Sequence, residues 1–162
     1  MNREKLKTLK TLKAHCAFLW SFVIRVRVGF RCELHQKDHL KCGNEIQAAH
    51  IVMKSIAPRT RYDLRNGRSI CSVHHKYYTH RPEFWAQMCM RLWPEDWKHV
   101  TSDEWMGVKN SDNLDEIFQF LWEEALQYDT ERKRMQNGFD SITSWYTENY
   151  DDINKKAGPS HE

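Results

Sequence analysis

Apolar residues in the first part of the chain recur every three or four positions, which is the period of an amphipathic helix. The pattern predicts a helix over residues 3–28, with Lys side chains covering the remaining surface. Gly29 is suited to end this helix. We expect a supporting helix whose lysines could contact a phosphate backbone. The apolar positions are Leu6, Leu9, Leu12, Cys16, Leu19 or Trp20, and Val23.

The middle of the chain has the pattern of two short strands and a helix. Asn66-Gly67 is a turn signal, and it predicts a hairpin with His50 on one arm. Residues 72–78 can form a helix that would face this hairpin. The segments expected to be extended are residues 50–52, 63–64 and 69–70.

Helical patterns return in the second half of the chain. Pro82 and Pro94 each suit the first turn of a helix. Residues 112–134 have the pattern of an acidic amphipathic helix, and residues 139–150 could form another. The expected apolar face of the acidic helix consists of Leu114, Ile117, Phe118, Leu121, Trp122 and Ala125.

Charge divides the chain of 162 residues into two parts. Residues 1–92 hold 18 Lys and Arg against 6 Asp and Glu, a balance of +12, while residues 93–162 hold 7 against 16, a balance of −9. A basic first part favours a polyanionic partner, and DNA is the first choice. The alternative is that the acidic part neutralises the basic part within the molecule. We expect an α+β protein with a domain over 1–100 and an acidic helical region with a disordered tail over 101–162.

The start of the chain has some features of a signal peptide, because lysines precede the apolar run CAFLWSFVI. However, Arg25 and Arg27 interrupt the run, no small-residue cleavage site follows, and the run is shorter than the ~20 residues of a membrane span. The five cysteines are an odd number and three lie among histidines, which favours metal binding in a reducing compartment. We expect a cytoplasmic protein without a membrane partner.

Cysteine and histidine spacing predicts a structural zinc site. Such a site needs four nitrogen or sulfur ligands from two chain segments. Cys71-x-x-His74 would supply one pair, and Cys32-x-x-His35 has the same spacing. Cys42 competes with His35 for the fourth place, and we prefer Cys42 because a thiolate followed by Gly is common in such sites. The alternative is that these residues are free thiols and surface histidines.

Two histidines remain for a second role. A neutral imidazole can take a proton from water near pH 7, and a divalent metal can stabilise a leaving phosphate oxygen. His50 and His75 could divide these tasks, which together are the minimum needed to hydrolyse a phosphodiester. A single histidine on a strand is more often structural, but the combination with Asn66 favours catalysis.

His50, Asn66 and His75, within AAHI, DLRNG and ICSVHH, resemble the HNH endonuclease motif. The flanking stretches LWSFVIRVRVGFRCE, TRYDLRNG and HRPEFWAQMCMRLWPEDW are similar to those of phage HNH nucleases, including recombination endonucleases of the NinG type. The resemblance covers residues 16–100. It implies a zinc-stapled ββα-metal core that hydrolyses DNA in the cytoplasm of a host cell, in a phage or mobile-element setting.

The resemblance also implies a role for each matched residue. His50 would be the general base, Asn66 would orient the hairpin, and His75 would bind the catalytic metal. The zinc would be held by Cys32, Cys42, Cys71 and His74.

One position departs from the family's pattern. Ala49 stands where many members have Asp or His as a second metal ligand. Asp63 is the nearest acidic replacement, and His80 is a weaker one. Oxygen ligands suit Mg²⁺ or Mn²⁺, whereas a site built from histidine alone favours Ni²⁺ or Zn²⁺.

A loop rich in arginine surrounds these residues and would neutralise the phosphates beside the scissile one. Its expected DNA contacts are Lys54, Arg59, Arg61, Arg65 and Arg68. The leading hypothesis is therefore a metal-dependent DNA endonuclease. One alternative is a non-catalytic zinc module that binds nucleic acid with a decayed HNH site. In another, the acidic C-terminal helices bind a protein partner or a second copy of the chain.

Overall fold

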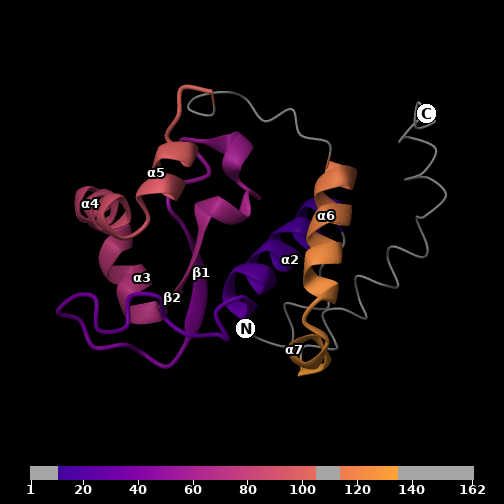
Figure 1. Ribbon diagram of the computed structural model, residues 1–162, viewed down its shortest axis with the longest axis horizontal. Helices are drawn as coiled ribbons and strands as arrows, with labels where there is room; N and C mark the ends of the chain where they lie inside the picture. The colour runs from indigo at the N-terminus through magenta and orange to yellow at the C-terminus, as the bar shows by residue number, and fades with distance from the viewer. Residues whose placement is uncertain (1–10, 105–113, 135–162) are drawn as a thin grey trace. The chain divides into compact units, whose positions relative to one another are not determined.

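The computed structural model describes residues 11–104 and 114–134, and it has an α+β fold that consists of helices and a two-stranded antiparallel sheet (Figure 1). Packing divides the chain into two compact units, residues 20–112 and residues 1–19 with 113–162. None of the helices within the described ranges is long and apolar enough to cross a membrane.

The expected domain boundary at residue 100 follows the change of charge, whereas the compact units follow packing. Cys16 explains part of the difference, because its thiol donates to the Leu114 carbonyl at 3.6 Å. This contact groups the start of the chain with the C-terminal helices. Charge alone does not show such long-range packing.

The sheet is a hairpin of β1, Ile46–His50, and β2, Gly67–Cys71. Its register pairs Ile46 with Cys71 and His50 with Gly67. A strand was expected at residues 50–52. The observed strand β1 shares only His50 with that range, because it lies on the N-terminal side of His50. A 16-residue loop joins the strands and contains two short 3₁₀ helices, η1 (Pro58–Thr60) and η2 (Leu64–Asn66).

The tight turn expected at Asn66-Gly67, and the strand expected at residues 63–64, are wrong. Asn66 ends η2, and Gly67 begins β2 with an extended φ of −114°. The Asp63 side chain accepts a hydrogen bond from the Arg65 N–H at 2.7 Å, and it thereby caps η2. A capping Asp and a following Gly produce the same sequence signal as a hairpin turn.

Gly67 is needed for a close approach between β2 and the helix α2, Leu12–Val26. A Cβ atom at this position would lie 2.2 Å from Ile24 Cδ1 and 2.9 Å from Trp20 Cζ2. Only a residue without a side chain allows the helix and strand to pack at this distance.

Helix α2 is the described part of the helix expected over residues 3–28; its first residues lie outside the described ranges. Gly29 has a φ of +64°, and the Phe30 N–H bonds to the Arg25 carbonyl at 2.9 Å. This left-handed turn ends the helix as expected. Most of α2 is buried, so it is a core helix rather than an amphipathic support. Its buried apolar residues are Cys16, Phe18, Leu19, Trp20, Phe22, Val23, Ile24 and Val26.

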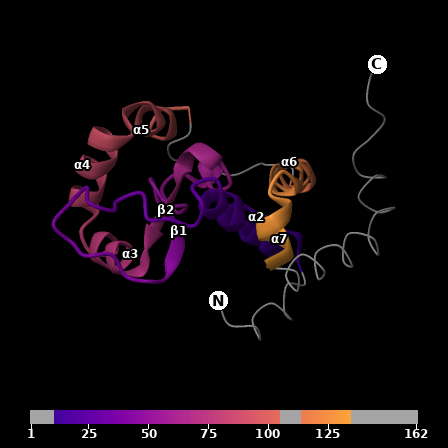
Figure 2. The same cartoon turned by 60° about the horizontal axis from the view of Figure 1, so that its bottom comes forward.

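Three helices follow the hairpin: α3, Ser72–Thr79, α4, Pro82–Leu92, and α5, Pro94–Val100. The prolines begin α4 and α5 as the sequence predicts. Figure 2 shows α3 beside the hairpin, with α4 and α5 following it. The core between these elements contains Leu34, Ala49, Ile51, Val52, Ala57, Ile70, Tyr78, Trp85, Cys89 and Val100.

The acidic helix expected over 112–134 is present as α6, Leu114–Leu126, and α7, Asp129–Arg134. Its buried residues are Phe118, Leu121 and Ala125, all on the expected apolar face. The helix expected over 139–150 and the tail lie outside the described residues. A partner or second copy at these helices remains a prediction.

Candidate functional site

Three cysteines and one histidine converge at the end of the hairpin, where β2 leads into α3. The ligand atoms of Cys32, Cys42, Cys71 and His74 all lie within 4.8 Å of one another. The three sulfur atoms are 3.6, 3.9 and 2.8 Å from His74 Nδ1, in that order. This cluster could hold a metal ion such as zinc. His35 is exposed and outside it, which decides the alternative in favour of Cys42.

Backbone amides support the thiolate forms of the cluster. The Cys71 N–H donates to Cys32 Sγ, and the Gly43 N–H donates to Cys71 Sγ, both at 3.3 Å. Burial raises the pKa of Cys71, but hydrogen bonds from His74 and Gly43 outweigh burial and lower the pKa to about 6. Burial and the two neighbouring thiols raise the pKa of Cys42 to about 12. A bound cation would allow all three to ionise.

The orientation of His74 is fixed from its other side by Asp38. His74 Nε2 donates to Asp38 Oδ1 at 3.0 Å, and the Tyr78 hydroxyl donates to Asp38 Oδ2 at 2.8 Å. A carboxylate behind a ligating histidine fixes its tautomer and directs the other nitrogen to the metal. Neither Asp38 nor Tyr78 is among the site residues predicted from the sequence. Tyr78 lies one helical turn after His74, which is a usable signal, but Asp38 is 36 residues away.

His50 lies at the end of β1 with one ring nitrogen engaged. Its Nε2 is 2.9 Å from the Arg61 carbonyl, and a carbonyl only accepts, so Nε2 carries the hydrogen. Nδ1 therefore has a lone pair that can take a proton. Burial lowers the pKa of His50, and the charges of Lys54, Arg61 and His75 act in the same direction.

Asn66 is fully buried and joins both ends of the loop between the strands. Its Oδ1 accepts from the Val52 N–H at 2.8 Å. Its Nδ2 donates to the Val52 carbonyl at 3.1 Å, the Thr60 carbonyl at 3.1 Å and the Thr60 hydroxyl at 2.9 Å. The side chain thus positions the chain immediately after His50.

His75 extends from α3 toward β1. Its Nδ1 donates to the Gln47 side-chain oxygen at 2.6 Å, which leaves Nε2 with the lone pair. Burial lowers the pKa of His75. Gln47 and Ala49 are two residues apart on β1 and therefore share a face of the strand. Gln47 was not anticipated, because a neutral amide gives no distinct sequence signal.

Asp63 and His80 do not supply the expected second ligand beside His75. The Asp63 carboxylate accepts from His99 Nε2 at 2.7 Å, and His80 is exposed at the end of α3. Within residues 11–104 and 114–134, no group of three or more His, Cys, Asp or Glu ligands includes His75.

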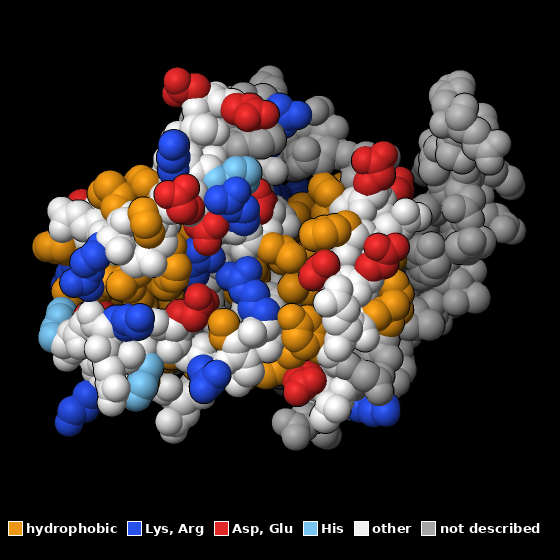
Figure 3. All heavy atoms as spheres, in the orientation of Figure 1, with side chains coloured by type: hydrophobic (Ala, Val, Ile, Leu, Met, Phe, Trp, Pro, Cys, Tyr) orange, Lys and Arg blue, Asp and Glu red, His pale blue; other side chains and the backbone are white. Residues whose placement is uncertain are grey.

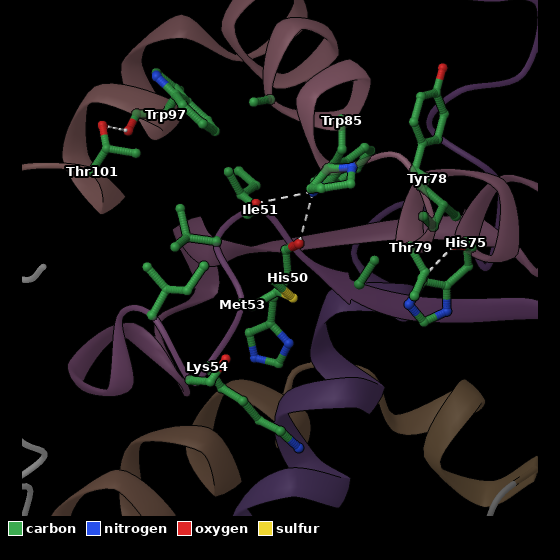
Figure 4. Close-up of a pocket in the computed structure, with 17 residues that line it drawn as sticks. His50, Ile51, Met53, Lys54, His75, Tyr78, Thr79, Trp85, Trp97 and Thr101 are labelled. Carbon is green, nitrogen blue, oxygen red and sulfur yellow. Dashed lines mark hydrogen bonds between the residues drawn. The ribbon is translucent and has the colours of Figure 1, made fainter. Parts of the chain in front are cut away.

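A cavity of about 520 Å³ brings the two histidines to one space (Figure 4). His50 enters it from the end of β1, and His75 enters from α3. Most other lining residues are apolar, and Lys54 is exposed at its edge. The arrangement places a proton acceptor and a metal-competent nitrogen along one cavity.

The predicted DNA-contacting residues separate into exposed and buried cations. Lys54 and Arg65 are both exposed, and Arg65 also pairs with Asp96 at 2.9 Å. Arg68 is 2% exposed; it also pairs with Asp96, and its guanidinium lies 4.6 Å from the Trp93 ring centre. The expectation that Arg68 contacts phosphate is therefore corrected, because this residue is part of the core.

The remaining predicted contacts, Arg59 and Arg61, are half-buried. On the face shown in Figure 3, basic side chains are interspersed with acidic ones. Of the five predicted DNA contacts, Lys54 is the one that lines the cavity.

Comparison with known proteins assigns no family to this chain. No family model, curated protein or solved structure matches it. The resemblance to HNH endonucleases thus remains a prediction that depends on His50, Asn66 and His75.

Proposed function

We propose that this protein is a metal-dependent HNH endonuclease that hydrolyses DNA phosphodiester bonds, with a zinc ion holding its ββα core together. The main support is the state of His50. Its Nε2 donates to a fixed carbonyl, its Nδ1 carries the lone pair, and His50 and His75 both line one cavity.

In this proposal, His50 Nδ1 takes a proton from water as the water oxygen attacks phosphorus. The bond between phosphorus and the leaving sugar oxygen then breaks. Because burial lowers its pKa, His50 is neutral at pH 7 and ready to act as the base. The Arg61 carbonyl stabilises the protonated ring that results, since its hydrogen bond strengthens as the ring becomes positive.

A divalent metal, when bound, would polarise the phosphate and stabilise the leaving oxygen. His75 would hold it through Nε2, and Ala49 contributes no ligand. A single imidazole without a protein carboxylate is a poor site for Mg²⁺ or Mn²⁺, which would depend on water and substrate phosphate oxygens for their other ligands. Ni²⁺ or Zn²⁺ would favour the imidazole itself.

A plasmid-nicking assay with added Mg²⁺, Mn²⁺ or Ni²⁺ tests the proposal. His50→Ala should reduce the nicking rate by about 10²–10⁴-fold, the usual effect of losing a general base, and leave DNA binding nearly intact. His75→Ala should also remove activity. His35→Ala is the matched control, because His35 is exposed and outside both sites. If neither His50→Ala nor His75→Ala alters nicking, this site is not responsible.

A second candidate function is a non-catalytic zinc module that binds nucleic acid. Ala49 favours it, because this residue is 4% exposed and leaves the expected ligand position empty of donor atoms. This alternative predicts DNA binding without nicking in any of the three metals, and no effect of His50→Ala.

A further inference from the structure

The cavity beside the two histidines extends well beyond them, and most of its wall is apolar. Ile51, Val52 and Ile70 are buried and form part of its lining. Three aromatic residues, Tyr78, Trp85 and Trp97, line other parts of it. Its volume of about 520 Å³ lies in the range of small-molecule sites, roughly 300–1,000 Å³. Water and a phosphate group alone would leave these apolar walls without a partner.

The aromatic wall is held in place before any ligand binds. The Trp85 indole N–H lies 3.0 Å from both the His50 and Ile51 carbonyls (Figure 4). The Tyr78 hydroxyl is held by Asp38. Fixed rings lose little conformational entropy when a flat ligand packs against them.

The cavity opens to solvent along the loop after β1. Met53 and Ile56 are 53% and 43% exposed, although both are large apolar residues and both line the cavity. Lys54, between them, is also exposed. The opening thus combines apolar contact surface with one positive charge.

We propose that this cavity accepts an unpaired nucleobase of the DNA substrate, next to the phosphate that is cleaved. The inference rests on the proposed function, because a phosphate at His50 and His75 would bring its own nucleoside to the cavity. A base has flat apolar faces for the aromatic wall and polar edges for the hydroxyls that also line the cavity, those of Ser55, Thr79 and Thr101. The Thr79 and Thr101 hydroxyls each donate to a backbone carbonyl at 2.7 Å, so toward a base they can act as acceptors. A base paired within a duplex is stacked on its neighbours and cannot enter.

Equilibrium binding without added divalent metal tests this inference separately from cleavage. The probes are two oligonucleotide duplexes, one fully paired and one with a single extrahelical 2-aminopurine. The full-length protein should bind the second about ten-fold more tightly, and 2-aminopurine fluorescence should decrease as the base stacks on an indole. Equal affinity with unchanged fluorescence would overturn the inference but leave the endonuclease proposal intact. Failure to bind either duplex would overturn both.

A matched pair of variants on α4 locates the effect. Ala86 lines the cavity, and the next residue, Gln87, is exposed and does not. Ala86→Phe should fill the space and remove the preference for the extrahelical base, while affinity for the paired duplex is unchanged. Gln87→Phe should retain the preference. If Ala86→Phe retains both its melting temperature and the preference, the cavity is not the base site. If Ala86→Phe unfolds, Ala86→Leu provides the same comparison with less added volume.

Discussion

The indole of Trp20 lies parallel to the imidazole of His50, with ring centres 4.1 Å apart and an interplanar angle of 12°. The Trp20 N–H donates to the Asp63 carbonyl at 3.1 Å, so the indole is anchored to the same loop whose Arg61 carbonyl accepts from His50. Stacking on Trp20 therefore fixes the plane of the His50 ring, and the hydrogen bond to the Arg61 carbonyl fixes its direction within that plane. Helix α2 contributes directly to this arrangement.

We expect nicking to persist down to about pH 6.5, the ordinary pKa of histidine, and to fall only below it. The folded-state pKa of His50 is lowered by burial, with Lys54, Arg61 and His75 adding to the effect, while the bond to the Arg61 carbonyl opposes it. A lowered pKa keeps the base unprotonated above its folded-state value, and activity is lost as the pH falls through that value. An NMR titration of His50 and a pH–rate profile measure this directly.

Trp20→Ala should expose the His50 ring and shift the acidic limb of the pH–rate profile toward higher pH. Trp20→Phe retains an aromatic face and should shift it less. A role in folding alone would lower the amount of active enzyme at every pH and leave the shape of the profile unchanged. If the acidic limb of both variants lies at the same pH as that of the unmodified protein, His50 is not the titrating base.

Removal of the metal should unfold the part of the chain that holds the hairpin, because such sites contribute folding free energy directly. We expect Cys71→Ser to lose one bound metal ion per chain and to lower the melting temperature by about 10 °C or more. Cys89→Ala is the control, since Cys89 is a buried core cysteine outside the cluster. Metal analysis and thermal melting measure the two effects. A chelated protein that melts at the same temperature as the purified one would refute the zinc assignment.

The cluster of Cys32, Cys42, Cys71 and His74 could be predicted from sequence because the chemistry and spacing of its members are distinctive. Two Cys-x-x-His pairs and a third cysteine followed by Gly left Cys42 and His35 as candidates for the fourth ligand, and only the geometry decided between them. Gln47 and Asp38 could not be chosen in this way. Each acts by contacting a histidine that is 28 or 36 residues distant, and neither has a local pattern.

The predictions for Asn66-Gly67 and for Arg68 were wrong for the same physical reason, which is that one sequence signal is compatible with several structures. Asn66-Gly67 has the sequence of a tight turn. In the structure, the Asn66 side chain instead donates a hydrogen bond to the Thr60 carbonyl of the loop, and Gly67 allows α2 to pack closely against β2. Arg68 satisfies a charge rule, yet Asp96, 28 residues away, holds it in the core. Long-range packing determines which meaning applies, and sequence periodicity does not report it.

The packing role of Gly67 predicts a specific rescue. Gly67→Ala should lower the free energy of unfolding by about 1–3 kcal/mol, because the added Cβ would lie 2.2 Å from Ile24 Cδ1. Ile24→Ala removes that atom together with Ile24 Cγ1, which would lie 2.5 Å from the added Cβ, and should cost about 2–5 kcal/mol alone. The double variant should lose less stability than the sum of the two single changes. Additive losses in urea unfolding would show that the clash is not the cause.

Substitutions of the exposed Lys54 and of the buried Arg68 should affect DNA binding differently. Lys54→Ala should weaken binding and reduce the slope of log affinity against log salt by about one, because one phosphate contact is lost. Its melting temperature should not change, since Lys54 is exposed. Lys98→Ala removes another exposed lysine, distant in sequence from the loop, and should leave the slope unaltered.

Arg68→Ala should show the opposite behaviour. Removing this buried guanidinium leaves Asp96 Oδ2 without its partner, although Arg65 still pairs with Oδ1, and it leaves the Trp93 ring without its cation. We therefore expect a loss of about 2 kcal/mol in unfolding free energy. The salt slope of the remaining folded protein should equal that of the unmodified chain. Measuring binding by fluorescence anisotropy at several salt concentrations, below the melting temperature of each variant, separates the two classes. A reduced slope in Arg68→Ala with an unchanged melting temperature would mean that this arginine contacts phosphate after all, and that its pairing with Asp96 yields to DNA.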